Sequence, residues 1–205
     1  TKNPIEDSSG SNYRKQLENS LKELDVEYID FYHMWGISWA IFEDKINVKN
    51  GPMSEAIKAK EEGLIKHISF SFHDKPENMI KLIDTGLFET VLCQYNLLDR
   101  RNEQAIEYAH DKGLGVVVMG PVGGGRLAAP SEVISNLLPG KVKSSAEIAL
   151  RFVIANRNVS CALSGMENIK MVEDNAIIAS NEDCLSEEEL KAVNAVMEEK
   201  KRLAE

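Results

Sequence analysis

Cysteine and histidine are scarce in this sequence, and their scarcity argues against several kinds of site. The three cysteines, Cys93, Cys161 and Cys184, are odd in number and far apart. We therefore expect reduced, buried, unreactive thiols in a cytosolic protein, without a disulfide framework. No two of the cysteines and the four histidines stand at the spacing of metal ligands, so no metal site is expected.

Long apolar runs and an excess of positive charge are also missing. No apolar run approaches the roughly 20 residues of a membrane span, and no signal-peptide pattern opens the chain. The 24 Lys and Arg residues are outnumbered by 33 Asp and Glu, which gives a net charge of −9. This balance argues against nucleic acid or an anionic membrane as a partner. No G-x-S-x-G stretch is present, so the nucleophile of a typical α/β-hydrolase is lacking.

What the sequence does contain is a regular alternation of strand-like and helix-like segments. Ser54 is expected to cap one helix and Gly63 to end it, Pro76 and Gly86 to bound the next, and Ser186 to open the last in a capping box. The expected strands are 27–35, 64–72, 89–96, 114–122 and 159–165, and the expected helices are 12–25, 53–63, 76–86, 102–113, 145–156, 168–180 and 186–202.

Apolar strands such as 116–119 are typical of a parallel sheet that is covered on both faces. Two closures are open: a doubly wound sheet, or a (β/α)8 barrel whose first strands are absent. The doubly wound nucleotide-binding fold needs a G-x-G-x-x-G turn after its first strand, and this sequence has none. The glycines at 123–125 come late in the chain, where a barrel has its phosphate-binding loops.

Several stretches together resemble the aldo-keto reductases in order and spacing, over nearly the whole chain. They are "LKELDVEYIDFYHMWG", "AKEEGLIKHISFSFHD", "CQYNLLDRRNEQAIEYAHDKGLGVVVMGPVGGGRL", "SSAEIALRFVIANRNVSCALSGM" and "NIKMVEDN". The turn "MGPVGGGRL" and the tail "LSEEELKAVNAV" are most similar to the bacterial and archaeal branch, which often carries a C-terminal ferredoxin-like extension. No C-x-x-C is present, so an iron–sulfur cluster would have no ligands in this chain.

The resemblance implies an α/β fold that is a partial (β/α)8 TIM-type barrel. It has about five β/α units with parallel strands in one domain over 1–205, and 186–203 forms an extra C-terminal helix. It also implies NAD(P)-dependent reduction of a small-molecule carbonyl by hydride transfer. The first strands of the family, which carry its catalytic Asp and Tyr, have no counterpart here.

The remaining catalytic positions of the family fall on three residues. Thr1-Lys2-Asn3-Pro4 is similar to the strand end that carries the catalytic lysine, which lowers the pKa of the tyrosine; otherwise Lys2 is a solvated lysine at a frayed terminus. The family's histidine aligns with Trp35, which has no titratable proton. His33 lies two residues earlier, on the same side of the strand, and is either a satisfied interior histidine or a displaced catalytic group.

The nicotinamide-binding positions of the family are partly kept. Ser71 matches the serine of a Ser-Asn pair, and Phe72 replaces the asparagine. The family's glutamine aligns with Leu92, and Gln94, on the same face of its strand, is a candidate substitute.

The resemblance also implies residues that contact the rest of the cofactor. The segment after the apolar strand would contact the nicotinamide ring and the pyrophosphate, unless its glycines form only a flexible turn. The segment "LSGMENIKMVEDN" would bind the adenosine phosphate at a helix N-terminus, unless "VEDN" is a solvated helix face. The candidates are Met119, Gly120, Pro121, Val122 and Gly123 in the first segment and Gly165, Met166, Asp174 and Asn175 in the second.

The choice between NADP and NAD is open at this stage. NADP-specific members place Lys or Arg where Gly165 and Met171 stand here, which weakens the case for NADP. Lys170 or Arg126 could compensate for this loss.

Two functions follow as expectations. The first is an aldo-keto reductase in a truncated and catalytically impaired form, and the second is a non-catalytic nucleotide- or phosphate-binding barrel fragment with a regulatory or assembly role. The strands at 28–35 and 158–164 are expected to have unpaired edges, so self-association is expected. The segment 36–52, with Trp39 and Phe42, either lines a substrate site or forms a small surface cluster.

Overall fold

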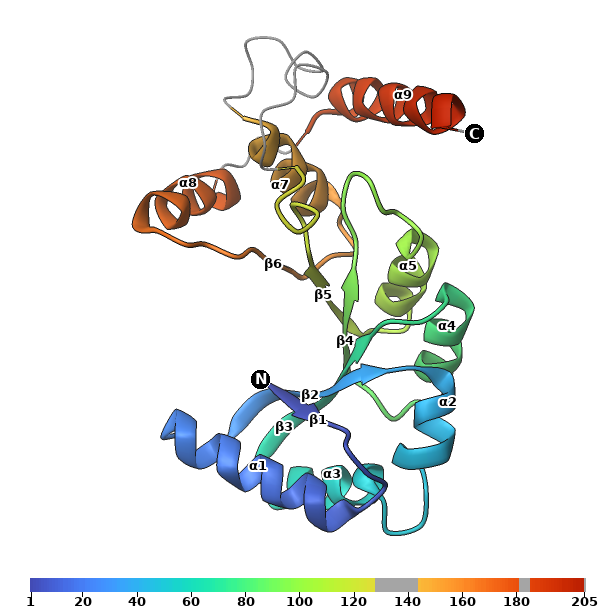
Figure 1. Ribbon diagram of the computed structural model, residues 1–205, viewed down its shortest axis with the longest axis vertical. Helices are drawn as coiled ribbons and strands as arrows, with labels where there is room; N and C mark the ends of the chain where they lie inside the picture. The colour runs from blue at the N-terminus through green and yellow to red at the C-terminus, as the bar shows by residue number, and fades with distance from the viewer. Residues whose placement is uncertain (128–143, 181–184, 205) are drawn as a thin grey trace. The chain divides into compact units, whose positions relative to one another are not determined.

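The computed structural model describes residues 1–127, 144–180 and 185–204, the last of these with side chains to Ala195. The chain divides into two compact units (Figure 1). Unit 1 contains Thr1–Cys93 and Gln104–Val117, and unit 2 contains Gln94–Glu103 and Val118–Glu205. Cys184, one of the three cysteines, lies outside the described ranges.

The six described strands follow one another in sequence order in one sheet. The first four pair in parallel, which confirms the expected parallel α/β architecture. The chain passes from one unit to the other within the fourth and fifth strands. The strands are β1 Lys2–Pro4, β2 Ile29–Ile37, β3 Ile65–Phe72, β4 Thr90–Gln94, β5 Gly115–Met119 and β6 Cys161–Leu163.

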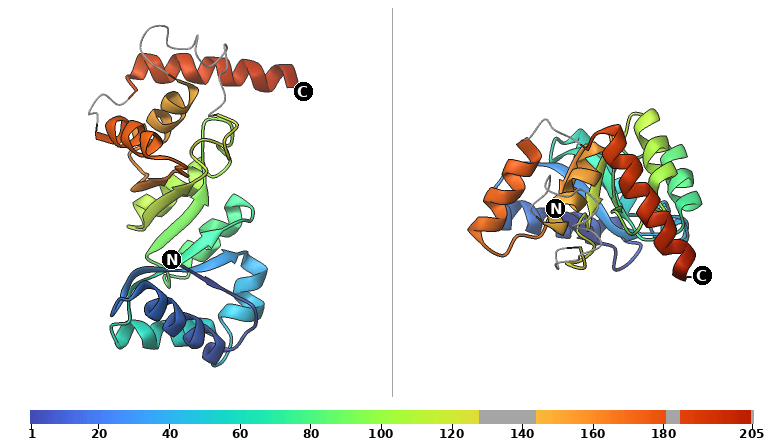
Figure 2. Two further views of the ribbon diagram at one scale, coloured as in Figure 1. Left: turned by 60° about the vertical axis from the view of Figure 1, so that its left-hand side comes forward. Right: turned by 90° about the horizontal axis from the view of Figure 1, so that it is seen from above.

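Helices connect the consecutive strands. In unit 1, α1 and α3 pack against each other and against β1 and β3, as the views in Figures 1 and 2 show. In unit 2, α7 packs against α8 and β6. The helices are α1 Gly10–Leu24, α2 Trp39–Ile41, the π-helix η1 Phe42–Ile46, α3 Pro52–Glu61, α4 Pro76–Asp84, α5 Glu103–Asp111, α7 Ser145–Ala155, α8 Ile169–Ser180 and α9 Glu187–Ala204.

The expectation of an unpaired edge at 28–35 is wrong. The first residues of the chain form β1, which pairs with β2 in the register Lys2↔His33, Asn3↔Met34 and Pro4↔Trp35. The resemblance indicated a strand end at residues 1–4, but three residues are too few for a periodic pattern, and the pairing with β2 was not expected. β6 stands at the other end of the strand order, as expected.

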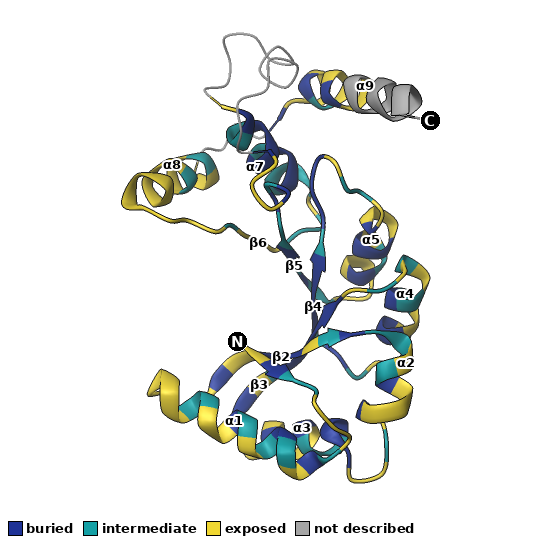
Figure 3. Cartoon of the chain, in the orientation of Figure 1, coloured by how far each residue is buried: buried dark blue, intermediate teal, exposed yellow. Residues whose placement is uncertain are grey.

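Burial varies from residue to residue along β2 (Figure 3). Tyr32 and Met34 are fully buried, and Asn3, paired opposite Met34, donates from Nδ2 to the Tyr13 carbonyl of α1 at 3.2 Å. This face therefore packs on the helices. Phe31, which alternates with Tyr32, is 45% exposed on the other face.

The helix boundaries follow local chemistry with one exception. α3 begins at Pro52 with Gly51 as its N-cap, and Ser54, expected to be the cap, lies inside the helix and donates to the Gly51 carbonyl at 2.9 Å. A Cβ on Gly51 would lie 2.6 Å from Val48, so close packing selects glycine as the cap. Proline at the first helical position then follows its usual preference.

The remaining helix signals are confirmed. Gly63 and Gly86 follow their helices with φ of +80° and +68°. Ser186 and Glu189 exchange both bonds of the capping box, at 2.8 and 3.2 Å.

The two described cysteines differ from each other. Cys93 is buried, and its pKa is raised to about 12 by that burial, so it is an inert thiol as expected. Cys161 is exposed, which corrects the expectation of burial. In the described ranges, no helix combines the length and the apolar character that a membrane crossing would need.

Candidate functional site

His33 lies in the middle of β2 and is 8% exposed. Its Nδ1 atom has no hydrogen-bond partner in the described part of the chain. Burial lowers the pKa of His33 to about 4, the charge of the chain's terminal amino group adds to this effect, and a hydrogen bond with the Phe70 backbone opposes it. The imidazole is therefore neutral near pH 7, and it can donate or accept a hydrogen bond but carries no charge.

Lys2 is brought beside His33. The two residues are paired in the β1–β2 register, and the charge of Lys2 is among the lesser causes that lower the pKa of His33. Lys2 itself is exposed. Because the positive charge of Lys2 favours the neutral imidazole, His33 adds no second positive charge beside Lys2.

Trp35 stands where the register of β2 and β3 shifts. The pairing is regular to Met34 and resumes at Ile37, and Trp35 is 54% exposed beside Gly36, whose φ is +66°. Irregularities of this kind re-aim side chains near sheet rims. An exposed indole can stack on a ring or donate one hydrogen bond, but it transfers no proton.

Ser71 is fully buried at the end of β3. Its Oγ atom accepts a hydrogen bond from the Gly36 backbone N–H at 2.8 Å. Ser71 therefore holds the irregular turn of β2 in place, a role that the sequence did not indicate. Leu92, which pairs with Ser71 in the register of β3 and β4, is buried.

In unit 2, Gln94 and Gly120 lie against each other at the ends of β4 and β5. A Cβ on Gly120 would lie 2.7 Å from Nε2 and 2.8 Å from Oε1 of Gln94. Gly120 also has a φ of +64°. The left-handed φ favours glycine at this position, and any side chain there would have to displace the amide of Gln94.

Two buried asparagines, Asn96 and Asn102, support this pair. Asn96 donates from Nδ2 to the Gly120 carbonyl at 2.9 Å, and Asn102 donates from Nδ2 to the Gln94 carbonyl at 2.8 Å. Local sequence patterns pointed to neither residue. Asn96 lies just after β4 and Asn102 just before α5, but their partners became visible only in three dimensions.

The segment after β5 is a glycine turn closed by its own backbone. Gly123, Gly124 and Gly125 have φ between +62° and +89°. The turn bonds are Gly123 N–H to Gly120 O, Gly125 N–H to Val122 O, Arg126 N–H to Gly123 O and Leu127 N–H to Val122 O. The N–H groups of Val122 and Gly124 take no part in these four bonds, and Gly124 and Arg126 are exposed. Backbone donors with a cation beside them suit an anionic ligand.

Met119 and Pro121 flank Gly120. Met119 is half-buried at the end of β5, and Pro121, which has no N–H to donate, is buried.

The segment after β6 is largely exposed. Gly165 and Met166 are exposed, and Asn175 donates from Nδ2 to Ser164 Oγ at 3.2 Å. Lys170 forms an i,i+4 ion pair with Asp174, at 2.8 and 3.0 Å, and this pairing raises the pKa of Lys170. The cation that sequence analysis offered for an extra phosphate is thus already paired with a carboxylate.

Phe42 does not lie at an open site. It is buried and contacts Phe88, with ring centroids 5.9 Å apart, and Trp39 packs on Phe42 at 5.5 Å. The Lys81 ammonium lies 5.5 Å from the Trp39 ring. These aromatics belong to the packing of α2, η1 and α4.

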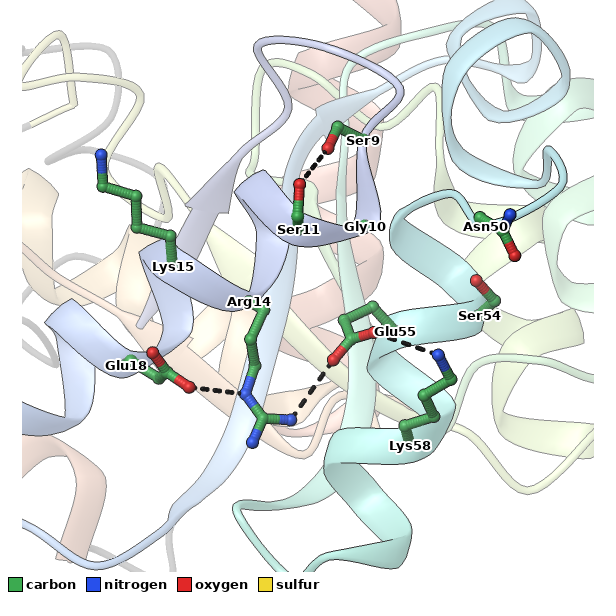
Figure 4. A pocket seen from close by; sticks show the side chains of 10 residues that line it. All are labelled: Ser9, Gly10, Ser11, Arg14, Lys15, Glu18, Asn50, Ser54, Glu55 and Lys58. Carbon is green, nitrogen blue, oxygen red and sulfur yellow. Dashed lines mark hydrogen bonds and ion pairs between the residues drawn. The ribbon is translucent and has the colours of Figure 1, made fainter.

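A hollow of about 550 Å³ lies between the first turns of α1 and α3 (Figure 4). Arg14 crosses it and binds Glu18 at 2.8 Å and Glu55 at 3.3 Å, and it also binds Glu62 at 2.6 Å. The guanidinium is thereby satisfied by protein carboxylates. Among the described residues, no cluster of three or more His, Cys, Asp or Glu side chains could hold a metal ion.

A model of the aldo/keto reductase family matches residues 1–198. The chain therefore belongs to this family, and the resemblance drawn from the sequence is confirmed.

Curated relatives support the same assignment. The chain is 28% identical over 164 residues to an uncharacterized oxidoreductase of Schizosaccharomyces pombe, an alignment that covers 79% of this chain and 51% of the relative. It is 26% identical over 218 residues to L-galactose dehydrogenase of Arabidopsis thaliana, covering 96% of this chain and 67% of the relative. The chain thus spans between half and two thirds of these proteins.

Solved structures confirm the fold. An aldo-keto reductase of Bacillus halodurans in its holo form superposes with a TM-score of 0.81 at 23% identity, covering 95% of this chain and 70% of that one. A thermostable aldo-keto reductase in complex with the inhibitor epalrestat superposes with a TM-score of 0.77 at 22% identity, covering 95% and 69%.

Proposed function

We propose that this chain binds NADP or NAD, and that unit 2 holds the pyrophosphate on the glycine turn after β5. The observation that carries the proposal is the left-handed turn Gly123–Gly125, whose neighbours Val122 and Gly124 keep N–H groups outside the turn bonds. The exposed Arg126 supplies positive charge at the same turn. This donor set fits a diphosphate.

The nicotinamide end would lie near Gln94 and Met119. The amide of Gln94 provides a donor and an acceptor that suit a carboxamide, and the thioether of Met119 suits a flat ring. The adenosine end would lie near Met166, which precedes α8, and near Asp174 and Asn175 in the middle of that helix. When bound, the dinucleotide would supply the hydride for carbonyl reduction.

The parallel sheet would then form part of a (β/α)8 barrel within one domain. The whole protein would reduce a small-molecule carbonyl in the cytosol. The structural likeness to aldo-keto reductases, with a TM-score of 0.81, supports this proposal. The exposure of Phe31 on one face of β2 supports it as well, because that face of a barrel strand is normally covered.

We further propose that the 205-residue chain on its own reduces carbonyls poorly, as expected of a truncated barrel. The family's Tyr proton donor and Asp have no counterpart in the resemblance. The family's His position holds Trp35, and the neighbouring His33 is buried and neutral. Lys2 would then have no tyrosine to activate.

A second candidate, a non-catalytic nucleotide-binding module with a regulatory or assembly role, is favoured by one contrast. The turn at Gly120–Leu127 is well formed, while the catalytic positions hold an indole and a neutral imidazole. Binding without turnover would select this function.

Two measurements separate these functions. Calorimetric titration of the purified chain with NADPH, NADH and ADP should give saturable binding of a dinucleotide, and binding of none of the three would refute the proposal. Turnover of a panel of aldehydes with NADPH or NADH should stay near background. Turnover well above background would instead identify the chain as an active reductase.

The preference between the two cofactors is also testable. Because Asp174 neutralises Lys170, we expect little discrimination in favour of NADPH. Asp174→Asn should free the ammonium and strengthen NADPH binding relative to NADH by a few-fold, a small effect because the ion pair is exposed to solvent. An unchanged ratio of the two dissociation constants would contradict this role.

Self-association through the sheet edges is the remaining proposal. β1 and β6 end the strand order, and exposed strand edges promote pairing between chains. Light scattering should detect species larger than the monomer, and a stable monomer at all concentrations would contradict the proposal.

A further inference from the structure

Asn96 connects the end of β4 to the glycine turn after β5, and its side chain is completely buried. Its Nδ2 atom donates to the Gly120 carbonyl at 2.9 Å. Its Oδ1 atom accepts from the backbone N–H groups of Leu98 and Asp99, each at 2.9 Å. Both ends of the amide are therefore used, and each contacts a different loop of unit 2.

The Gly120 carbonyl is the point on which the glycine turn closes. It accepts the first bond of the turn, from the Gly123 N–H, also at 2.9 Å. Asn96 and Gly123 thus share the two lone pairs of one oxygen. Loss of the Asn96 bond would leave the Gly120 carbonyl with the Gly123 bond alone, at a glycine, the residue with the greatest backbone freedom.

The same contact orients Gly120 toward Gln94. The position of a Cβ on Gly120 falls 2.7 Å from Gln94 Nε2, and Asn102 holds the Gln94 carbonyl at 2.8 Å. Gln94, Gly120 and the turn are therefore held by two buried amides that follow β4. Asn102 supports the strand end, and Asn96 alone of the two reaches the turn.

We infer that Asn96 is a positioning residue, which fixes the glycine turn in the arrangement that accepts the dinucleotide pyrophosphate. This inference rests on the proposed binding function. It assigns to Asn96 no contact with the ligand, because the side chain is completely buried and both ends of its amide bind protein groups.

The test replaces the donor and keeps the acceptor. In Asn96→Asp the carboxylate can still accept from the backbone N–H groups of Leu98 and Asp99. It places an oxygen opposite the Gly120 carbonyl, so that carbonyl loses its side-chain donor. Asn96→Ser is the second variant, because its hydroxyl can accept from a nearby backbone N–H but is too short for both contacts. Asn3→Asp is the matched control: Asn3 is equally buried in unit 1 and donates from Nδ2 to the Tyr13 carbonyl.

Each variant is titrated with the dinucleotide that the unaltered chain binds more tightly. Losing one well-placed hydrogen bond should weaken binding about tenfold for both Asn96 variants, and Asn3→Asp should stay within about twofold. Hydrogen exchange at saturating ligand adds a readout that general damage would not produce. In both Asn96 variants, the protection of backbone amides that the ligand induces should fall at 120–127 and persist in α8, at 169–180.

The outcomes are distinct. If the unaltered chain binds no dinucleotide, the proposed function fails and the inference fails with it. If the unaltered chain binds the dinucleotide and both Asn96 variants bind it with the same affinity as the unaltered chain, only the positioning role is refuted. A loss of protection in α8 equal to that at 120–127, or an equal loss of affinity in Asn3→Asp, would also refute it, because the effect would then be general destabilisation.

Discussion

Acidification should destabilise unit 1 through His33. The ordinary pKa of a histidine is 6.5, and burial lowers that of His33 to about 4. Between these values the unfolded chain binds a proton that the folded chain does not. Stability is therefore fully present above pH 6.5 and is lost as the pH falls toward 4.

The size of the effect follows from the two pKa values. The contribution of one group is RT times the logarithm of the ratio of its two binding polynomials, which gives a loss of about 2 kcal/mol between pH 7 and pH 5. This is a large part of the stability of a small domain, which is about 5–15 kcal/mol. Other groups titrate over the same range, so the test compares two proteins at each pH.

The comparison is between the unaltered chain and His33→Gln, which keeps a hydrogen-bonding side chain but does not titrate. Urea unfolding is followed by tryptophan fluorescence, because the only two tryptophans, Trp35 and Trp39, lie in unit 1 with His33. We expect the unaltered chain to lose about 2 kcal/mol more than His33→Gln between pH 7 and pH 5.

The control is His110→Gln, since the His110 side chain is 52% exposed on α5. This variant should follow the unaltered chain at both pH values. Equal losses in the unaltered chain and His33→Gln would refute the reasoning, because they would mean that the imidazole of His33 is hydrated in the folded state.

Two structural predictions concern the helix ends. Gly10→Ala should cost about 1–3 kcal/mol, because its Cβ would lie 2.8 Å from the Asn50 carbonyl. Gly63→Ala, with nothing within 4 Å of its Cβ, should cost only the strain of a left-handed backbone, about 1–2 kcal/mol. If thermal unfolding shows that Gly10→Ala loses less stability than Gly63→Ala, the packing argument is contradicted. Ser186→Ala removes the cap bond to Glu189 and should cost about 1 kcal/mol, with fraying of α9 in circular dichroism; unchanged helicity and stability would contradict it.

Local patterns predicted most of the elements. Gly63 and Gly86 marked helix ends because only glycine adopts the left-handed conformation without strain. The Ser186–Glu189 capping box predicted the start of α9, because both bonds form within one turn of helix. The parallel sheet followed from the length and apolar character of strands such as 116–119.

Packing and strand pairing explain the errors. Ser54 was the better cap by residue type, but α3 begins at Pro52 with Gly51 as its cap, where a Cβ would lie 2.6 Å from Val48. β1 is a three-residue strand held by its pairing with β2. Residue type and periodicity record neither the space around Gly51 nor this pairing.

The sequence by itself determined the family, the alternation of strands and helices, and the positions where glycine chemistry was required, because these depend on neighbouring residues. Only the tertiary structure decided that the imidazole of His33 is neutral, that Ser71 holds Gly36 and that Asn96 reaches Gly120. The physical reason is that the pKa and the hydrogen-bond partner of a side chain are set by the atoms that folding places around it. Those atoms belong to other turns and strands, and local sequence patterns do not record their distance.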